Sequence, residues 1–320
     1  MPRRDGRCVD LMVTGGVRRA DVEAMFTLAH LSDPHLAPLP WPNPFELMGK
    51  RLGGFINWHR KRRNFHLTAV LDRIVHDVKS RAADHIAVTG DLVNLSLAAE
   101  YRPARSWLER LGSAHDVTLV PGNHDTYVRS KARHPQRHWA DYMRGDGAAS
   151  AAAVVFPFLR RRGPVALIGL STAVPAPPFR ATGRLGAEQL ARFAELSASL
   201  RREGAFRVVL IHHPPVIRPE WHNERLLDGD AFLAVLKEHG AELVLYGHEH
   251  VHSLRWFDAP RPVPAIGVPS ASADLGGQYD SAAYNLYFID GRPGAWRCEM
   301  ASRGLSTDGI VELKRSVLAG

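Results

Sequence analysis

Five short polar motifs in the chain carry side chains that bind divalent metal ions in proteins. They are Asp-Pro-His at 33–35, Gly-Asp at 90–91, Gly-Asn-His-Asp at 122–125, His-His at 212–213 and Gly-His-Glu-His at 247–250. Neutral imidazole, carboxylate and amide oxygen suit a borderline-hard ion such as manganese, iron, zinc or cobalt. Each motif alone is weak, because the same residue types also cap turns. Five of them in one chain favour a metal site.

Each motif directly follows an apolar run that is typical of a buried strand. The carboxyl ends of such strands are where open α/β sheets place their sites, so we expect the five loops to converge. His248 and His250 are two residues apart, and alternate side chains of an extended segment face the same way. The strand-like runs cover 26–31, 84–89, 117–121, 206–211 and 243–246.

Helical periodicity separates these runs and predicts the layers of the fold. Apolar residues recur at helical spacing over 65–80, 98–111, 186–202 and 230–239, and the basic, then Ala-rich segment 129–153 is also predicted to be helical. After residue 252, short strands with Gly and Pro turns replace the alternation. The pattern predicts an α/β protein in which two mixed sheets pack face to face and are covered by helices.

The predicted domain organisation is a single domain over 25–305. Residues 1–24 are Arg- and Gly-rich and are expected to form a mobile tail, which makes Met25 a candidate for the true start; 306–320 is predicted to be a C-terminal tail. No stretch approaches the roughly 20 apolar residues of a membrane span. The start lacks an apolar signal region, and Cys8 and Cys298 are the only cysteines, so we expect a cytoplasmic location.

An aromatic and basic insertion is predicted at 36–66, between the first strand and the first clear helix. It carries Trp41, Phe45, Phe55 and Trp58 ahead of four consecutive basic residues at 60–63. Long connections of this kind serve as lids or binding loops. Aromatic and basic residues together suit a phosphate-bearing or lipid-like ligand. A packed insertion or a homodimer contact is the alternative.

The charge balance leaves several partners open. Lys and Arg exceed Asp and Glu by 8, and the surplus is clustered. A basic rim attracts phosphorylated substrates, acidic lipid or nucleic acid, whereas solvated arginines are the plain alternative. The sequence contains no recognised nucleic-acid-binding module, so a nucleic acid partner is not predicted.

The number of candidate ligands exceeds what one ion needs and suffices for two ions that share a carboxylate. Two ions about 3.5–4 Å apart clamp the attacking and leaving oxygens of an in-line phosphoryl displacement. They also lower the pKa of a bridging water, so that hydroxide is available near neutral pH. The candidate residues are Asp33, His35, Asp91, Asn123, His124, His212, His248 and His250.

The order of the five motifs resembles the calcineurin-like metallophosphoesterase superfamily, and the motifs span residues 33–250. The resemblance implies a four-layer α-β-β-α sandwich and two divalent ions, with manganese or iron favoured over zinc or cobalt. It implies that Asp91 bridges the ions and that His124 is not a ligand. His124 would act as general acid or charge stabiliser, oriented by a carboxylate. The implied ligands of the first ion are Asp33, His35 and His250, and those of the second are Asn123, His212 and His248.

Residues around the ligands receive weaker predictions. Asp125 is expected to stabilise its own loop, and His213 and His252 stay outside the ligand set. The predicted substrate-side residues are Asn94, His213, Trp41, Phe45 and Trp58.

Finer motifs are similar to the bacterial cyclic-nucleotide phosphodiesterase branch of this superfamily, including 183–190 (Gly-Arg-Leu-Gly-Ala-Glu-Gln-Leu) and 211–215 (Ile-His-His-Pro-Pro). The implied function is hydrolysis of cyclic AMP or similar small phosphodiesters. The insertion departs from that branch and favours the alternative of a pyrophosphatase or diesterase for a nucleotide-linked lipid or other phospholipid. A non-catalytic binding protein is the third hypothesis, and the complete ligand set argues against it.

Overall fold

Two six-stranded mixed sheets form the centre of the protein. The computed structural model describes residues 25–319. The tail predicted for 1–24 lies outside them. The first sheet has the strand order β12-β11-β10-β1-β2-β3, and the second has the order β4-β5-β6-β7-β9-β8. The strands of the first sheet are β1 Phe26–Leu31, β2 His85–Val88, β3 Val117–Leu119, β10 Ala283–Arg292, β11 Ala295–Ser306 and β12 Gly309–Ala319. Those of the second are β4 Phe158–Arg162, β5 Val165–Gly169, β6 Phe206–Leu210, β7 Leu243–Tyr246, β8 Ser253–Phe257 and β9 Val263–Gly267.

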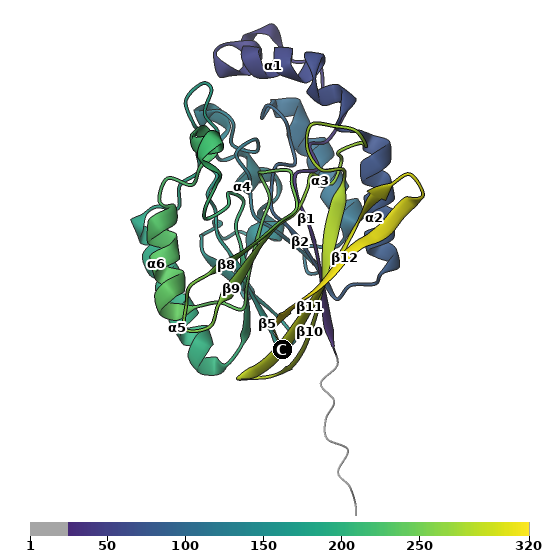
Figure 1. Ribbon diagram of the computed structural model, residues 1–320. Helices are drawn as coiled ribbons and strands as arrows, with labels where there is room; N and C mark the ends of the chain where they lie inside the picture. The colour runs from purple at the N-terminus through teal and green to yellow at the C-terminus, as the bar shows by residue number, and fades with distance from the viewer. Residues whose placement is uncertain (1–24, 320) are drawn as a thin grey trace, which may run out of the picture.

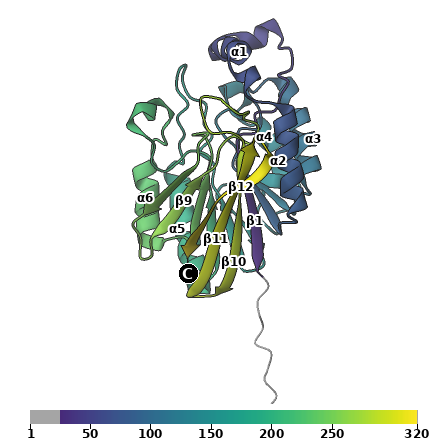
Figure 2. The ribbon, with the colours of Figure 1, turned by 45° about the vertical axis from the view of Figure 1, so that its right-hand side comes forward.

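Helices cover both outer faces of the sheet pair. Figures 1 and 2 show α2 and α3 against the first sheet and α5 and α6 against the second, so the predicted α-β-β-α sandwich is confirmed. Among the described residues, no helix combines the length and apolar character that a bilayer crossing requires. The helices are α1 Lys50–Arg60, α2 Thr68–Ser80, α3 Tyr101–Leu111, α4 His134–His138, α5 Ala187–Glu203 and α6 Gly229–His239.

Alternation along the strands of the second sheet separates two apolar cores. Val165 and Leu167 belong to the core between the sheets, whereas Ala166 and Ile168 belong to the core under α5 and α6. Successive side chains of a strand point to opposite faces, so a strand covered on both sides must be apolar throughout. This explains why the central strands read as continuous apolar runs.

The parallel strands bring all five predicted loops to one end of the molecule. In the first sheet β1 pairs in parallel with β2, and β2 with β3. In the second sheet β6 pairs in parallel with β7. The carboxyl ends of parallel strands lie at the same edge, so the loops after β1, β2, β3, β6 and β7 meet there.

The segment 36–66 folds into a short helical unit above this edge. It contains the 3-10 turns η1 Pro44–Leu47 and η2 Arg62–Asn64 on either side of α1. Figure 1 shows α1 at the top of the molecule, away from the two sheets. Two buried side chains attach it: Trp58 is 3% exposed, and the Arg51 guanidinium donates to the carbonyls of Leu95 and Ser96.

Two predictions about secondary structure are wrong. Residues 309–319 are not a tail, because β12 pairs with β11 over its whole length. Its charged residues at 312, 314 and 315 suit an exposed edge strand and concealed the strand pattern. The segment 129–153 is not one helix: it contains η4 Arg129–Lys131, the five-residue α4 and η5 Ala140–Met143, followed by turns. Two glycines and a proline interrupt that segment, which disfavours a long helix.

Asp77 connects α2 to two strands, which leads to a stability prediction. Its carboxylate accepts hydrogen bonds from Arg303 Nε at 2.7 Å, from Arg303 Nη2 at 3.1 Å and from the Tyr284 hydroxyl. Burial alone would raise the pKa of Asp77, but these hydrogen bonds lower it to about 2. Asp77→Asn is expected to lower the free energy of unfolding by about 1–3 kcal/mol at neutral pH.

The same contribution depends on pH with a defined sign. Because the folded-state pKa of Asp77 lies below its unfolded value, the stabilisation is present above about pH 4 and is lost as the pH falls towards 2. Urea unfolding of wild type and Asp77→Asn at pH 7 and pH 3 measures this. Asp72→Asn, at an exposed position of α2, is the control. Equal losses for Asp77→Asn and the control would contradict the assignment.

Candidate metal centre

Three of the five loops hold ligand-type side chains in an unusual backbone conformation. Asp33, His35, Asp91, His248 and His250 all have positive φ, between 38° and 69°. This region is uncommon for residues other than glycine and costs of order 1–3 kcal/mol each. Strain of this kind concentrated in three loops indicates a functional site, because packing alone gives no reason for it.

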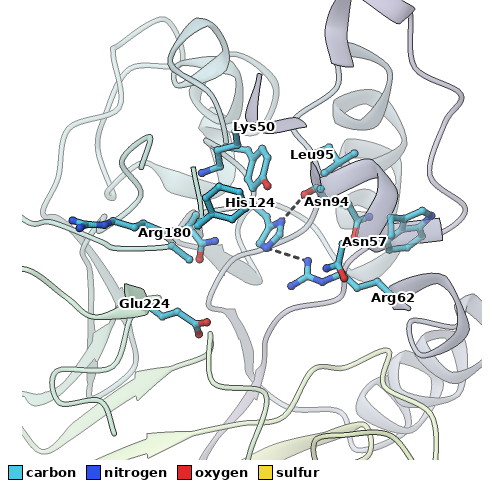
Figure 3. Close-up of a pocket in the computed structure, with 14 residues that line it drawn as sticks. Lys50, Asn57, Arg62, Asn94, Leu95, His124, Arg180 and Glu224 are labelled. Atoms are coloured by element: carbon cyan, nitrogen blue, oxygen red, sulfur yellow. Dashed lines mark hydrogen bonds between the residues drawn. The ribbon is translucent and has the colours of Figure 1, made fainter. Parts of the chain in front are cut away.

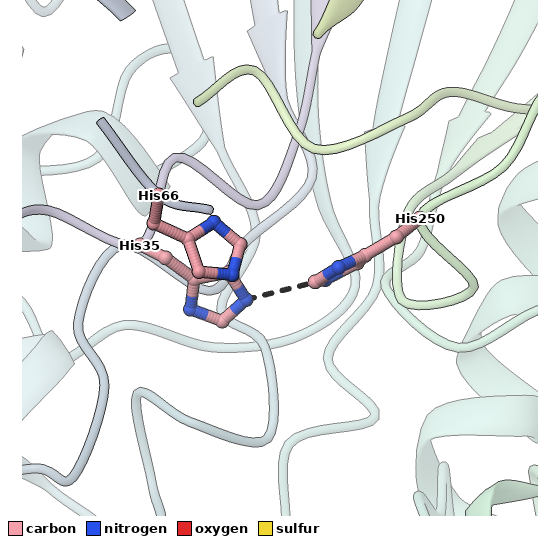
Figure 4. Close-up of side chains that lie close together, drawn as sticks. All are labelled: His35, His66 and His250. Carbon is pink, nitrogen blue, oxygen red and sulfur yellow. Dashed lines mark hydrogen bonds between the residues drawn. The ribbon is translucent and has the colours of Figure 1, made fainter. Parts of the chain in front are cut away.

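The first group of side chains lies between the loops after β1 and β7. His250 Nε2 is 3.3 Å from Asp33 Oδ1 and 3.2 Å from His35 Nε2, and Figure 4 shows the two imidazoles pointing at each other. Asp33 and His35 are fully buried, and Asp33 Oδ1 has no hydrogen-bond partner within the described chain. A buried carboxylate oxygen without a donor, facing two imidazole nitrogens, suits a cation.

The second group comes from the loops after β3, β6 and β7. Asn123 Oδ1 lies 3.0 Å from His212 Nε2 and 2.9 Å from His248 Nδ1. The other nitrogen of each imidazole faces a backbone carbonyl: His212 Nδ1 that of Thr89, and His248 Nε2 that of Glu224. Those carbonyls require protons on the nitrogens that face them, so in neutral rings the nitrogens beside Asn123 carry lone pairs. In that protonation state three acceptor atoms converge, which are Asn123 Oδ1, His212 Nε2 and His248 Nδ1.

Asp91 lies between the two groups. Its Oδ2 is 3.9 Å from His35 Nε2 on one side and 3.4 Å from His212 Nε2 on the other. Its Oδ1 accepts the backbone N–H of His124 at 2.8 Å, which fixes the orientation of the carboxylate. The predicted bridging residue thus occupies the position from which one oxygen reaches both groups.

The electrostatics of the site favour bound positive charge. Burial would raise the pKa of Asp33 and of Asp91, but neighbouring histidines, His250 and His212 respectively, hold both values below the ordinary range. Burial would lower the pKa of His212, but Asp91 and Asp33 raise it to about 9. Burial lowers the pKa of His35 strongly and that of His248 to about 3, so these rings offer lone pairs. The donor set fits divalent cations.

His124 lies beside the ligands but is oriented differently from what was predicted. Its Nδ1 donates to the Asn94 backbone carbonyl, so a carbonyl rather than a carboxylate orients the ring. Its Nε2 is 3.0 Å from Arg62 Nη1. Guanidinium is only a donor, so Nε2 must accept and the ring is neutral in this geometry. Burial and the Arg62 charge accordingly lower the pKa of His124 to about 4.

Asp125 stabilises its own loop, as expected from the sequence, and also ties it to the loop after β2, which was not predicted. Its carboxylate accepts four backbone N–H groups, at 2.8–3.1 Å, from residues 91, 92, 93 and 122. Close approach of these loops requires glycine, because a Cβ on Gly122 would lie 2.1 Å from Asp91 Oδ1. The glycine of the Gly-Asn-His-Asp motif is therefore required because no side chain fits between the two loops.

The predicted substrate-side residues have different surroundings. Asn94 lines the cavity beside His124, and so does Trp58. His213 is fully buried and uses both ring nitrogens within the protein, on Thr172 Oγ1 at 2.6 Å and on the Ala181 carbonyl at 2.9 Å. Trp41 and Phe45 are 83% and 80% exposed on the segment before α1 and do not line that cavity.

Two residues that lie directly beside the predicted ligands and His124 were missed in the sequence, and both come from the insertion. His66 is 5% exposed, its Nδ1 contacts Ser272 Oγ at 2.9 Å, and Figure 4 shows its ring beside His35. One of its ring nitrogens lies within 4.8 Å of ligand atoms of His35 and His250. Arg62 contacts His124, as described above. The available signal was a basic run at 60–63 with a histidine three residues after its end, but no strand precedes these residues to indicate a site.

The chain belongs to the calcineurin-like phosphoesterase family, whose profile matches residues 26–252. The family is one of phosphoesterases, and membership implies divalent metal ions, in agreement with the donor set. The chain is also similar to a probable cyclic nucleotide phosphodiesterase of Synechococcus, with 29% identity over 177 residues. That match covers 54% of this chain and 60% of the length of the relative.

Solved structures agree on the fold. A dimetal phosphatase from Danio rerio has a TM-score of 0.56 at 12% identity, over 92% of this chain and 98% of that one. A purple acid phosphatase from yellow lupin seeds has a TM-score of 0.58 at 12% identity, over 92% of this chain and 53% of that one. At this identity the likeness supports the sandwich architecture alone.

The hydrogen bonds of Asp125 generate a prediction about the metal loops. In Asp125→Asn an amide N–H₂ replaces one acceptor oxygen and faces backbone N–H groups, so the loop carrying Asp91 shifts. We expect metal affinity to fall about 10–100-fold and stability to fall by about 2–4 kcal/mol. Manganese titration calorimetry and urea unfolding measure the two effects. Asp116→Asn, on the exposed loop before β3, is the matched control; unchanged affinity in Asp125→Asn would contradict the role.

Proposed function

We propose that the chain hydrolyses phosphodiesters at a centre of two divalent ions, with cyclic nucleotides such as cyclic AMP, or similar small diesters, as substrates. The observation that carries the proposal is the position of Asp91 Oδ2 between two sets of ligand atoms. Asp33, His35 and His250 would hold one ion, and Asn123, His212 and His248 the other. Manganese and iron are favoured, with zinc or cobalt as alternatives.

Two divalent ions held by these ligands would supply an activated water and neutralise charge on the phosphoryl oxygens. The remaining task falls to the protein: to hold the phosphoester in line and to stabilise charge on the oxygens that face away from the ions. His124 and Arg62 adjoin the ligands on one side. With His124 neutral, Arg62 supplies the positive charge, so the pair stabilises charge and the general-acid alternative loses support.

A cavity of about 100 Å³ over the ligands supports a substrate with a ring. Asp91, His248 and His250 line it, together with the rings of Trp221 and Tyr279. The two rings meet edge to face, with centroids 6.2 Å apart. An aromatic wall beside a phosphoryl site suits a nucleobase, since each base has a face to stack. The similarity to a probable cyclic nucleotide phosphodiesterase points the same way.

The exposed apolar residues of the insertion support a second candidate, a phosphodiesterase or pyrophosphatase for a lipid-linked phosphoester. Trp41, Phe45, Met48 and Leu52 are each at least 50% exposed and belong to the same insertion as the basic run at 60–63. Apolar side chains beside basic ones are typical of segments that lie on an anionic membrane surface.

A substrate assay tests the first candidate against the second. We expect the manganese-loaded protein to cleave bis(p-nitrophenyl) phosphate, and cyclic AMP with kcat/KM at or above about 10⁴ M⁻¹s⁻¹. Cleavage of the aryl diester with cyclic AMP untouched, together with activation by anionic vesicles on a lipid-linked pyrophosphate, would select the second candidate. Loss of all diester cleavage at full metal occupancy would leave a binding protein.

Removal of the bridging carboxylate tests the two-metal centre. Asp91→Ala is expected to lose bound metal and diester cleavage together, because both ions lose a ligand. Elemental analysis of purified wild type and variant gives the number of ions per chain, and circular dichroism checks folding. Asp280→Ala, a carboxylate outside the ligand set, is the control. Two ions retained in Asp91→Ala would refute the bridge.

A double-mutant cycle tests whether His124 and Arg62 act as one unit. His124→Ala and Arg62→Met are each expected to keep both ions and to lose roughly 10²–10³ in kcat, the range for one transition-state donor. Because the two groups share one contact, the double variant should lose little more than either single variant. Losses that multiply would indicate independent roles, and loss of metal in His124→Ala would make it a ligand instead.

A further inference from the structure

A second cavity lies beside the one over the metal ligands. It has a volume of about 270 Å³ and shares Arg62, Asn123, His124 and Glu224 with its smaller neighbour, so the two adjoin. Figure 3 shows Lys50, Arg62 and His124 around it, contributed by different segments of the chain. The first two come from the insertion, at the start of α1 and in η2.

The cavity has an excess of positive charge. Lys50, Arg62 and Arg180 line it, and within residues 25–319 none of the three forms an ion pair. Glu224 is the acidic residue among those that line it. Arg180 is exposed, and Figure 3 shows its side chain directed away from His124, so Lys50 and Arg62 are the cations closest to the ligands.

Lys50 is held in place with donors to spare. Its Nζ donates to the Ala176 carbonyl at 3.1 Å and lies 4.0 Å from the centroid of the Tyr127 ring. An ammonium group has three donors, so two remain for a ligand. Burial lowers the pKa of Lys50 to about 8, a shift that a bound anion would reverse. The Asn57 and Asn94 side chains line the same cavity.

We infer that this cavity is a subsite for a second phosphate group and that the substrate class is phosphoesters with two linked phosphates, in particular pyrophosphate diesters of a nucleotide. The inference rests on the phosphoesterase function proposed above and, between its two candidates, favours pyrophosphate cleavage over cleavage of a cyclic nucleotide. A cyclic nucleotide carries one negative charge. Its single phosphate would bind at the metal ligands, so Lys50 would have no phosphate to bind. A pyrophosphate places one phosphate at the ligands and the next one beside Arg62 and Lys50.

The reaction is an ordinary hydrolysis. The water oxygen forms a bond to the phosphorus held at the metal ligands, and the bond from that phosphorus to the bridging oxygen breaks. The bridging oxygen leaves with the second phosphate, which the two cations hold. The water proton goes to solvent, and the products are two phosphomonoesters, with no change of oxidation state.

Comparison of AMP with ADP as ligands tests the subsite. Calorimetry on the manganese-loaded protein, at one fixed free manganese concentration, gives the ratio of their dissociation constants. We expect ADP to bind at least about tenfold more tightly than AMP, a typical contribution of one partly buried charge pair. Lys50→Gln, which keeps a donor for the Ala176 carbonyl but removes the charge, should bring the ratio to about two.

Two further variants separate a subsite from general surface charge. Lys50→Arg keeps the positive charge and should therefore keep the preference for ADP. If Lys50→Gln does not fold, the wild type and Lys50→Arg still test the inference. Arg60→Met removes an exposed charge from the end of the same helix and should keep the wild-type ratio. Equal binding of AMP and ADP to wild type, an unchanged ratio in Lys50→Gln, or an equal fall in Arg60→Met would each overturn the inference.

Hydrolysis of bis(p-nitrophenyl) phosphate by wild type distinguishes failure of the proposed subsite from failure of the proposed phosphodiesterase function. This diester has one phosphate, so its cleavage reports on the proposed phosphodiesterase and not on the subsite. Cleavage with equal binding of AMP and ADP would reject the subsite alone. Absence of cleavage at full manganese occupancy would reject the diesterase, while the calorimetric ratio would still report on the subsite.

Discussion

The structure depends on one constraint: acceptor atoms from both sheets converge where hydrogen-bond donors between them are scarce. Asp33 Oδ1 and Asp91 Oδ2 face imidazole nitrogens on either side, in a buried setting. Such a cluster is costly without positive charge. The left-handed backbone at five of these residues adds to that cost. Divalent ions would offset both contributions, so metal binding and the stability of this end of the protein are expected to be coupled.

The surroundings of the ligands are as specific as the ligands themselves. Backbone carbonyls of Thr89 and Glu224 select the tautomers of His212 and His248. Asp125 holds the Asp91 and Gly122 loops together through four backbone N–H groups. These partners orient the rings and the Asp91 carboxylate before any ion binds, which reduces the reorganisation that binding requires. The sandwich contributes rigid strand ends, and the loops contribute the chemistry.

The insertion after β1 does more than cover the site. Through Trp58, Arg51 and His66 it is anchored among the loops, and through Arg62 and Lys50 it adds positive charge beside His124. The insertion would therefore select the substrate for a site whose architecture is shared with other phosphoesterases. The sheets would set the reaction, whereas a segment of about thirty residues would set how many phosphates the substrate carries.

Much of the fold and of the candidate site followed from local pattern. Continuous apolar runs predicted the central strands, because strands buried on both faces must be apolar, and the motif after each run predicted the loops that converge. The strand β12 was missed, because an exposed edge strand tolerates charge and its pairing with β11 is a tertiary fact. Residue types alone therefore predicted the family and the sandwich, which are confirmed, and a set of metal ligands that stays a prediction. Only the folded chain decided that a carbonyl orients His124, that Arg62 and His66 enter the site, and that Lys50 faces a cavity, because these contacts join residues 30 to more than 200 positions apart.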